Sequence, residues 1–368
     1  MKVCTVVGAR PQFVKAFPVS NALSDRHEEV FVHTGQHYDA ELSGVFFEEL
    51  PIPEPDVNLG VGSDTHARQT AAMLTGLDDV LDEHDPDVLL VYGDTNSTLA
   101  GALVGAKRDV TVAHVEAGLR SYDRAMPEEV NRVLTDHASG LLFVPSENAA
   151  ETLADEGITE GVHDTGDVMY DSLLAVRERA RDRSAVLDRL GYDDGEYVLA
   201  TVHRAKNTDD PARLRSIVEG LGDAPLPVIL PAHPRTAAAL REMDFDGGLP
   251  EGIDLADPVG YLDFVRLIDG AERVATDSGG VQKEAFYLGT PCVTLREETE
   301  WLETVTCGWN VLVGADAEAI SRNLRRAFDC GEQPQPYGDG TAADRIVRAL
   351  EATVADAPTE EAVEEVTP

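Results

Sequence analysis

Basic residues are scarce in this sequence, and lysine is the scarcer of the two. The 368 residues include 68 aspartates and glutamates but only 30 lysines and arginines, five of them lysine, and the formal net charge is −38. Nucleic acids and anionic membranes repel so acidic a surface, so we expect neither as a partner. Acid-driven disorder is excluded because 43% of the residues are hydrophobic and recur at regular intervals. We therefore expect adaptation to a cytosol of high salt, where charges are screened within about 3 Å at 1 M.

Cysteines, aromatic residues and long apolar runs are also few. The four cysteines form no CxxC pair, and Cys4 and Cys292 fall inside strand-like runs, so we expect no disulfide, no metal site and a reducing cytoplasm. No apolar run reaches the roughly 18 to 20 residues of a membrane-spanning helix. The first apolar run reaches Gly8 too soon for a signal peptide and is interpreted as a β-strand.

Short apolar runs alternate with helical segments along the whole chain, which is the α/β pattern of doubly wound parallel sheets. We expect two Rossmann-like domains, residues 1–166 and 167–341, because a long charged helix from Asp171 to Leu190 separates two series of strands. A last helix is expected over about 342–356, and the acidic segment 358–368 is expected to be disordered. The expected strands are 3–7, 29–33, 88–92, 110–114, 140–145, 197–202, 227–231, 253–256, 273–276, 292–295 and 310–312.

Carboxylates follow two strands of the first series. Asp94 comes just after the run VLLVYG, Glu116 follows the run TVAHV, and Glu128 and Glu129 come slightly later, after a Met-Pro pair. Because ligands of open α/β sheets bind at the carboxyl ends of strands, such groups can exchange protons with a bound molecule. The alternative is that Asp94 and Glu116 are helix caps or solvated loop charges.

The segment after the first strand, GARPQFVK (8–15), places two cations at the start of a helix. It is not GxGxxG, which excludes the dinucleotide fingerprint. Arg10 stands at the strand exit and Lys15 about one turn into the helix, an arrangement that suits a phosphate or diphosphate. The alternative is that both are ordinary surface bases.

A turn of small residues follows a strand of the second series. Ser278, Gly279 and Gly280 open a helix there, and small residues let backbone N–H groups approach an anion closely. Glu284, one turn later, is placed to accept hydrogen bonds from a ribose. His203 and His233 follow two other strands of this series, which favours ligand contact over a purely structural role.

These motifs together resemble the non-hydrolysing UDP-N-acetylglucosamine 2-epimerase family. The resemblance covers nearly the whole chain and keeps the family's motif order, and with the acidic composition it points to a halophilic archaeon. The matching segments are GARPQFVK (8–15), TGQHYD (34–39), YGDTNSTLAGAL (92–103), HVEAGLRS (114–121), PEEVNR (127–132), TGDVMYD (165–171), HRAKNTD (203–209), TDSGGVQKEA (276–285) and PYGDG (336–340).

The resemblance implies a glycosyltransferase-B-type fold, with the active site in the cleft between two Rossmann-like domains and the C-terminal helix packed back on the first. It implies a homodimer and no cofactor. The implied reaction is reversible inversion at C2 of UDP-GlcNAc to give UDP-ManNAc. UDP is eliminated across C1–C2 to give 2-acetamidoglucal and is then added back.

The resemblance also implies a role for each candidate residue. Proton transfer on two faces of the sugar falls to Asp94, Glu116 and Glu128, and the assignment of acid and base among them stays open. UDP is a leaving group that must stay bound, so it needs fixed positive charge and N–H donors. UDP would be held by Arg10, Lys15, His203, His233, Ser278, Gly279 and Gly280, with Phe264 on the uracil or simply in the helix core, and Glu284 on the ribose.

Three positions depart from the family's usual pattern. Lys206 and Lys283 stand where glutamate is common, and Trp301 stands where many bacterial members have arginine. Trp301 also occurs in relatives that act on UDP-sugars with a carboxylate or a second acetamido group, so a UDP-diacetamido-uronic acid is the main competing substrate. The same motifs would also suit a glycosyltransferase, a hydrolysing epimerase or a non-catalytic UDP-sugar sensor.

Overall fold

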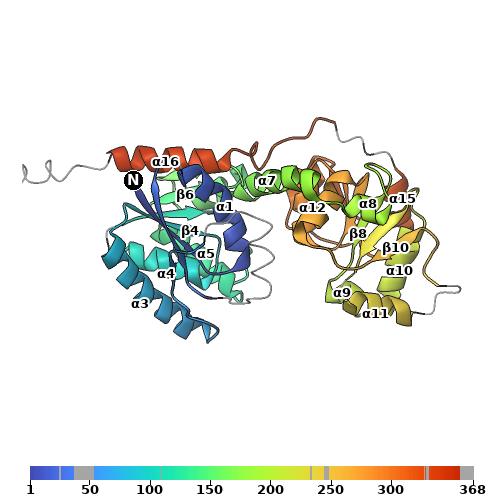
Figure 1. Cartoon of the computed structure of the whole chain (residues 1–368), viewed down its shortest axis with the longest axis horizontal. Helices are drawn as coiled ribbons and strands as arrows, with labels where there is room; N and C mark the ends of the chain where they lie inside the picture. Colours follow the sequence, from blue (N-terminus) through green and yellow to red (C-terminus); the bar gives the residue numbers. More distant parts are fainter. Residues whose placement is uncertain are drawn as a thin grey trace, which may run out of the picture. The chain divides into compact units, whose positions relative to one another are not determined.

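The computed structural model describes residues 1–24, 26–36, 54–108, 110–232, 234–243, 248–326, 328 and 331–356. The chain forms two compact units: unit 1 is Met1–Ser172 with the segment that begins at Gln335, and unit 2 is Leu173–Pro334. Each unit is a parallel sheet with helices packed against it (Figure 1). Within the described ranges, no helix is both long and apolar enough to cross a membrane.

Unit 1 contains a seven-stranded sheet, counted over the described residues, in the order β3-β2-β1-β4-β5-β6-β7. The strands are β1 (Lys2–Val7), β2 (Glu28–His33), β3 (Val57–Asn58), β4 (Val88–Tyr92), β5 (Thr111–Val115), β6 (Leu141–Val144) and β7 (Val162–Asp164). The helices are α1 (Arg10–Ser24), α3 (His66–His84), α4 (Asn96–Gly105), α5 (Pro127–Ala138), α6 (Glu147–Asp155), the start of α7 (Val168–Arg183), and α16 (Ala342–Asp356). The strand order reverses between β1 and β4, which is where sheets of this class bind ligands.

Helix α4 packs unusually close to the sheet of unit 1. A Cβ at Gly101 would lie 2.7 Å from Val91 Cγ1, and one at Gly105 would lie 2.6 Å from Val112 Cγ2. All five residues of β4 beneath it are buried, as expected for a central parallel strand. Thr95 and Thr98 form a capping box that fixes the first turn of α4. The buried strand β4 and the capped first turn of α4 therefore fix the two ends of the loop that joins them.

Unit 2 contains a six-stranded sheet over its described residues, in the order β10-β9-β8-β11-β12-β13. The strands are β8 (Val198–Thr201), β9 (Val228–Pro231), β10 (Ile253–Ala256), β11 (Arg273–Thr276), β12 (Cys292–Thr294) and β13 (Asn310–Leu312). The helices, after the end of α7, are α8 (Val186–Leu190), α9 (Ala205–Thr208), α10 (Pro211–Gly222), α11 (Pro234–Glu242), α12 (Tyr261–Gly270), α13 (Gly279–Tyr287), α14 (Leu302–Thr306) and α15 (Ala317–Arg325). Here the strand order reverses between β8 and β11.

The expected α/β fold is confirmed, and each expected strand is present with ends that differ by at most one residue. Strands β3 and β7 were missed because they are short and none of their residues is buried. The single helix expected from Asp171 to Leu190 is wrong, since α7 ends at Arg183 and α8 begins at Val186. Ser184 explains the break: its hydroxyl accepts from the Val186 N–H (3.2 Å) and donates to Asp263 (2.6 Å), in competition with helical hydrogen bonds.

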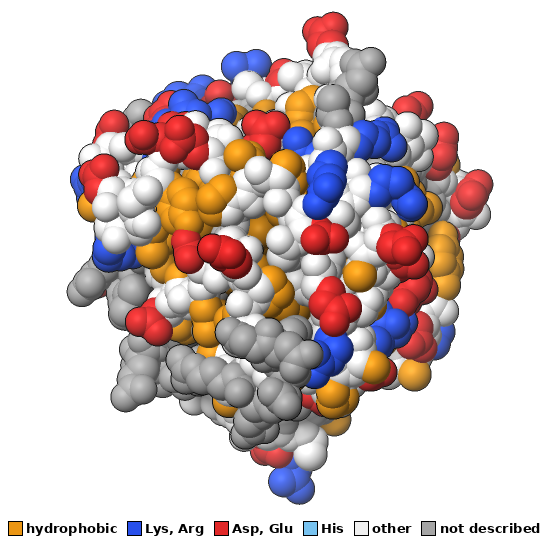
Figure 2. Space-filling model, turned by 90° about the vertical axis from the view of Figure 1, so that its right-hand side faces the viewer, with side chains coloured by type: hydrophobic (Ala, Val, Ile, Leu, Met, Phe, Trp, Pro, Cys, Tyr) orange, Lys and Arg blue, Asp and Glu red, His pale blue; other side chains and the backbone are white. Residues whose placement is uncertain are grey.

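Acidic and basic side chains are interspersed on the surface. Figure 2 shows both kinds next to one another on the face it presents. Some arginines serve two carboxylates, as Arg108 does with Asp78 and Asp82, each at 2.5 Å. Because exposed pairs contribute at most about 1 kcal/mol each, these contacts organise the surface more than they stabilise the fold.

Helix α16 lies beside α1 within unit 1 (Figure 1). The Asp171 carboxylate accepts hydrogen bonds from the N–H groups of Ala342 (3.2 Å) and Ala343 (2.9 Å), which have no partner within their own helix. Burial raises the pKa of Asp171 to about 6 from its ordinary 3.8, although the two N–H donors act in the opposite direction. Asp171 thus links α7 to the last helix and titrates in an unusual range.

We predict that Asp171 makes the protein less stable as the pH rises from about 4 to about 6. A carboxyl group whose pKa is raised by folding holds its proton more tightly in the folded state, so its contribution to the free energy of unfolding falls across that interval. In Asp171→Asn this contribution is absent. Urea denaturation at several pH values should show that the difference in the free energy of unfolding between wild type and variant changes by about 2–3 kcal/mol. A flat difference, like that expected for the exposed control Asp182→Asn on α7, would contradict the prediction.

Candidate active site

Asp94 and Glu116 lie side by side at the carboxyl edge of the unit 1 sheet. They follow the neighbouring parallel strands β4 and β5. Lys15, on the helix that follows β1, reaches the same place: its Nζ and Glu116 Oε2 each lie 3.3 Å from where a Cβ on Gly93 would be. The structure therefore brings together three of the predicted residues at the point where the strand order reverses.

Glu116 forms an ion pair with Lys15, and each side chain is only 15% exposed. Burial favours the neutral amine, but the carboxylates of Glu116, Asp94 and Asp167 together raise the pKa of Lys15 above its ordinary value. Lys15 is therefore a fixed positive charge beside Glu116. Its contact with a phosphate stays a prediction.

The backbone at Glu116 is left-handed, with φ of 73°, a conformation that favours glycine. The strain costs about 1–3 kcal/mol and persists only where the surroundings enforce it. Here the N–H groups of Glu116 and Ala117 both donate to the Phe143 carbonyl on β6, each at 3.1 Å. A strained carboxylate at a ligand-binding edge indicates selection for function.

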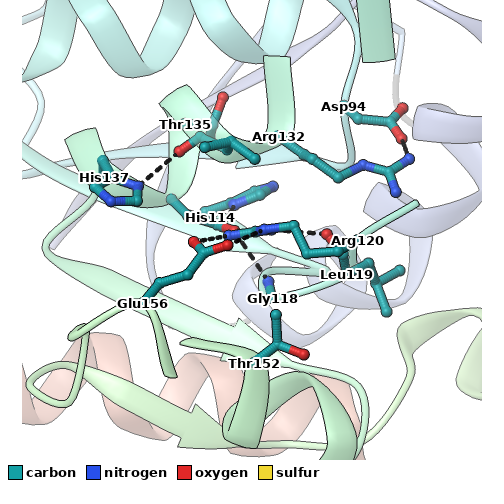
Figure 3. A network of polar contacts seen from close by, with 12 residues as sticks. Asp94, His114, Gly118, Leu119, Arg120, Arg132, Thr135, His137, Thr152 and Glu156 are labelled. Carbon is teal, nitrogen blue, oxygen red and sulfur yellow. Dashed lines mark hydrogen bonds and ion pairs between the residues drawn. The ribbon is translucent and has the colours of Figure 1, made fainter. Parts of the chain in front are cut away.

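Asp94 forms an ion pair with Arg132 of α5 (Figure 3). The same helix holds the backbone of Asp94, since Asn131 Nδ2 donates to the Asp94 carbonyl at 3.0 Å. The Asp94 side chain is 33% exposed and so can meet a ligand. Each of the two strand-end carboxylates thus has its own cation, Lys15 for Glu116 and Arg132 for Asp94.

The adjacent residues Glu128 and Glu129, in the first turn of α5, have different surroundings. Glu129 is buried and accepts hydrogen bonds from the N–H groups of Ser121 (2.8 Å) and Tyr122 (3.0 Å). Burial opposes its ionisation, but these donors and Arg132 lower the pKa of Glu129 below its ordinary value. Glu129 therefore shapes the loop, whereas Glu128 is exposed and available to a ligand.

The loop between β1 and α1 is tight and already hydrogen-bonded. A Cβ on Gly8 would lie 2.0 Å from Ser97 Oγ, so no larger residue fits. Gln12 Oε1 accepts from the N–H groups of both Gly8 (2.8 Å) and Ala9 (3.0 Å). An anion at this loop would therefore depend on side chains, of which the Arg10 side chain lies outside the described part of the structure, as does His233 altogether.

In unit 2, the turn Ser278-Gly279-Gly280 joins β11 to α13. Ser278 caps the helix, with its hydroxyl accepting from the Val281 N–H at 3.4 Å. A Cβ on Gly279 would meet nothing closer than 3.6 Å, and one on Gly280 nothing closer than 3.9 Å. Packing within the chain does not require glycine at either position, and the role of this backbone in binding an anion stays a prediction. A helix N-terminus of this kind suits a phosphate.

His203 leaves the neighbouring strand β8 and is oriented by Asp277. Its Nδ1 lies 3.1 Å from Asp277 Oδ1, while the N–H groups of His203 and Arg204 also donate to this fully buried carboxylate. Asp277 raises the pKa of His203 above its ordinary value, against the effect of burial. With Nδ1 engaged and the side chain 55% exposed, Nε2 of His203 is left accessible, and its contact with a ligand stays a prediction.

Glu284 and Phe264 lie on α13 and α12. Glu284 accepts a hydrogen bond from the Tyr261 hydroxyl at 3.0 Å, and burial raises its pKa above the ordinary value despite that donor. Phe264 is half-buried in the α12 helix. Their contacts with ribose and uracil stay predictions. Within the described residues, no three His, Cys, Asp or Glu side chains are grouped to hold a metal ion.

Several residues of these sites were missed by sequence reasoning. Arg132 and Asp277 lie inside family motifs, but nothing local shows that they contact Asp94 and His203, which lie 38 and 74 positions away. The contact of Lys283 with Trp301 was missed too: Lys283 Nζ lies 4.2 Å from the centre of the Trp301 ring, whose N–H donates to the Gly279 carbonyl at 2.8 Å. The available signal was that both residues depart from the family pattern beside the same turn.

Comparison with known proteins identifies relatives along nearly the whole chain. The UDP-N-acetylglucosamine 2-epimerase family model matches residues 21–351. The chain is 48% identical over 355 residues to a UDP-N-acetylglucosamine 2-epimerase homolog of Methanococcus maripaludis, covering 95% of this chain and 99% of the relative. It is also 48% identical over 360 residues, with the same coverage, to the UDP-2,3-diacetamido-2,3-dideoxy-D-glucuronate 2-epimerase of Pseudomonas aeruginosa.

Solved structures agree with these sequence relationships. UDP-GlcNAc 2-epimerase from Methanocaldococcus jannaschii matches with a TM-score of 0.88 and 41% identity, over 96% of this chain and all of the relative. A crystal structure of an M. jannaschii UDP-GlcNAc 2-epimerase in complex with UDP-GlcNAc and UDP matches with a TM-score of 0.75 and 42% identity, with the same coverage. The calicheamicin glycosyltransferase CalG4 shares only the fold, at 13% identity and a TM-score of 0.53, over 99% of this chain and 97% of that one. The chain therefore has the glycosyltransferase-B-type fold and belongs to the UDP-N-acetylglucosamine 2-epimerase family.

Proposed function

We propose that this protein catalyses the reversible, non-hydrolysing epimerisation of UDP-GlcNAc to UDP-ManNAc at C2. The observation that supports the proposal most strongly is the pair Asp94 and Glu116, which leave adjacent strands, each with its own cation. Inversion at a carbon requires proton transfer on two faces, and two separately held carboxylates meet that requirement. Glu128, exposed on the first turn of α5, is the third candidate.

In the proposed reaction a carboxylate removes the C2 proton while the C1–O bond breaks. The C2–H electrons form the C1–C2 double bond, and UDP leaves with the C1–O electrons to give 2-acetamidoglucal. A proton is then delivered to the opposite face of C2 as a UDP oxygen returns to C1. The carboxylate charges held beside Lys15 and Arg132 suit the first step, and a carboxylate that has gained a proton suits the second.

Unit 2 is proposed to hold the UDP group throughout. The negative charge that develops on the departing diphosphate needs donors that are already in place. The open Gly279 and Gly280 backbone supplies N–H groups, and His203, made more basic by Asp277, supplies positive charge. Retained UDP can add back, which distinguishes this proposal from a hydrolysing epimerase.

A UDP-diacetamido-uronic acid is the second candidate substrate. The chain is equally similar to relatives named for the two sugars. Of the departures, Trp301 donates to the carbonyl of Gly279, in the turn proposed to hold the diphosphate, and Lys283 lies over the Trp301 ring. Changes beside this turn favour a sugar whose recognition differs from the common pattern.

The test is proton NMR of UDP-GlcNAc with the protein in D2O and about 1 M KCl, the concentration at which screening should offset the proposed halophilic surface. Formation of UDP-ManNAc with deuterium at C2 and without free UDP would support the proposal. Free UDP would indicate a hydrolysing enzyme. Turnover of only the diacetamido uronic acid would establish the second candidate, and UDP binding without exchange in either sugar would contradict both. Light scattering of the same sample tests the proposed homodimer.

A further inference from the structure

A largely buried polar network around His114 and Arg120 lies in unit 1, in the same region as Asp94 (Figure 3). His114 is the last residue but one of β5, and both it and Asp136 of α5 are fully buried. His114 Nδ1 lies 2.7 Å from Asp136 Oδ1, and His114 Nε2 lies 2.7 Å from the Gly93 carbonyl oxygen. The ring thus connects α5 to the residue before Asp94.

Both neighbours of the His114 ring are acceptors. A peptide carbonyl can only accept, so Nε2 carries a proton. Asp136 Oδ2 already accepts from Arg120 Nη1 (2.6 Å) and from the Gly118 N–H (3.2 Å), two donors that stabilise its ionised form. An ionised carboxylate also only accepts, so Nδ1 carries a proton as well.

Charge balance leads to the same conclusion. Arg120 reaches from Asp136 to Glu156, with Nε to Oε1 at 2.9 Å and Nη2 to Oε2 at 2.7 Å. The side chains of Arg120 and Asp136 are at most 2% exposed. Glu156 lies at the solvent edge of the network, with its side chain 28% exposed, and Arg120 is shared between it and the buried Asp136. A doubly protonated His114 makes this set of four charges neutral, and an unbalanced charge beside buried groups is costly.

We propose that His114 is a positioning residue, held as an imidazolium, that fixes the Gly93 carbonyl and so sets Asp94 against Glu116. Gly93 has φ of 62° and donates its own N–H to the Val115 carbonyl at 3.0 Å. The loop after β4 is therefore attached to β5 twice, once through the backbone and once through His114. The charged groups facing the ring are Asp136, Arg120 and Glu156, with the Lys15–Glu116 pair beyond Gly93.

The protonation state is tested by NMR of the full chain labelled with 15N histidine. His114→Gln identifies the His114 signals among the ten histidines. We expect both His114 ring nitrogens to carry protons at neutral pH, whereas a neutral imidazole has one bare nitrogen. A His114 ring with one bare nitrogen at neutral pH would overturn the proposal. If His114→Gln does not fold, Asp136→Asn serves instead, and loss of one His114 proton in that variant would support it.

The positioning role is tested by kinetics, and this part rests on the proposed epimerase function. We expect His114→Gln to lower kcat about 100-fold, as small displacements of reacting groups do, with KM within about 3-fold because unit 2 binds UDP. The matched control His137→Gln should keep wild-type kcat. Wild-type kcat in a folded His114→Gln variant would overturn the positioning role. If wild-type protein turned over no UDP-sugar, the proposed function would fail, whereas the NMR result would still decide the protonation of His114.

Discussion

Glu116→Gln should lower kcat for C2 epimerisation about 1,000-fold, within the range for a lost general acid or base. The amide has the same shape but cannot take a proton at C2. Affinity for UDP should change less than about 2-fold because, apart from Arg10 and Lys15, the proposed UDP contacts are in unit 2. Lys15 loses its partner in this variant. The measurements are steady-state kinetics on UDP-GlcNAc and calorimetric titration with UDP.

A control separates chemistry from folding in this experiment. Glu151→Gln removes an exposed carboxylate from α6 of the same unit and should leave kcat unchanged. Thermal unfolding of both variants shows whether the left-handed backbone at residue 116 tolerates the substitution. If folded Glu116→Gln kept more than a tenth of wild-type kcat, Glu116 would have no essential proton-transfer role. Isotope exchange at C2 in the same variant would show which half of the reaction is lost.

His203→Asn should lower kcat/KM about 100-fold at pH values where His203 is protonated, because it removes a cationic donor to the departing diphosphate. Asp277→Asn should have a different, pH-dependent effect. The hydrogen bond and charge of Asp277 raise the pKa of His203, so wild-type His203 stays protonated to higher pH. Without them that pKa falls, and the alkaline decline of kcat/KM should begin at lower pH. Rate profiles across pH for both variants test this.

The control for this experiment is Asp188→Asn, which removes an exposed carboxylate of α8 in the same unit. Its pH profile should overlay that of wild type. At acid pH, where His203 is protonated in either protein, Asp277→Asn should approach wild-type kcat/KM. An unshifted alkaline limb would mean that Asp277 supports only the local backbone through the His203 and Arg204 N–H groups.

The fold was predictable because burial in parallel sheets leaves a strong local pattern. β4, with all five residues buried, and β6, with all four buried, are visible as continuous apolar runs. β3 and β7 carry no buried residue and leave no such run. The break at Ser184 depends on Asp263, which is distant in sequence, so no local pattern could show it.

The sequence allowed the chemical groups of the candidate site to be predicted, but not the residues with which they pair. Asp94, Glu116 and His203 follow strands, so their positions at a ligand edge can be inferred from the strand pattern. The partners that hold them come from other elements: Arg132 from α5, Lys15 from α1 and Asp277 from the end of β11. His114 begins the motif HVEAGLRS, but its role gave no signal, because a buried histidine in a strand looks like core until its two acceptors are known.

The left-handed backbone at Glu116 has a consequence for how related gene sequences are interpreted. Glycine at this position would relieve the strain but would leave Lys15 without its ion-pair partner, so selection for the carboxylate maintains glutamate there. A copy of this gene released from that selection should drift first at residue 116, toward glycine or asparagine, while its core is still intact. Among related sequences, the residue aligned with position 116 should then separate active enzymes from duplicates that have lost or changed their function.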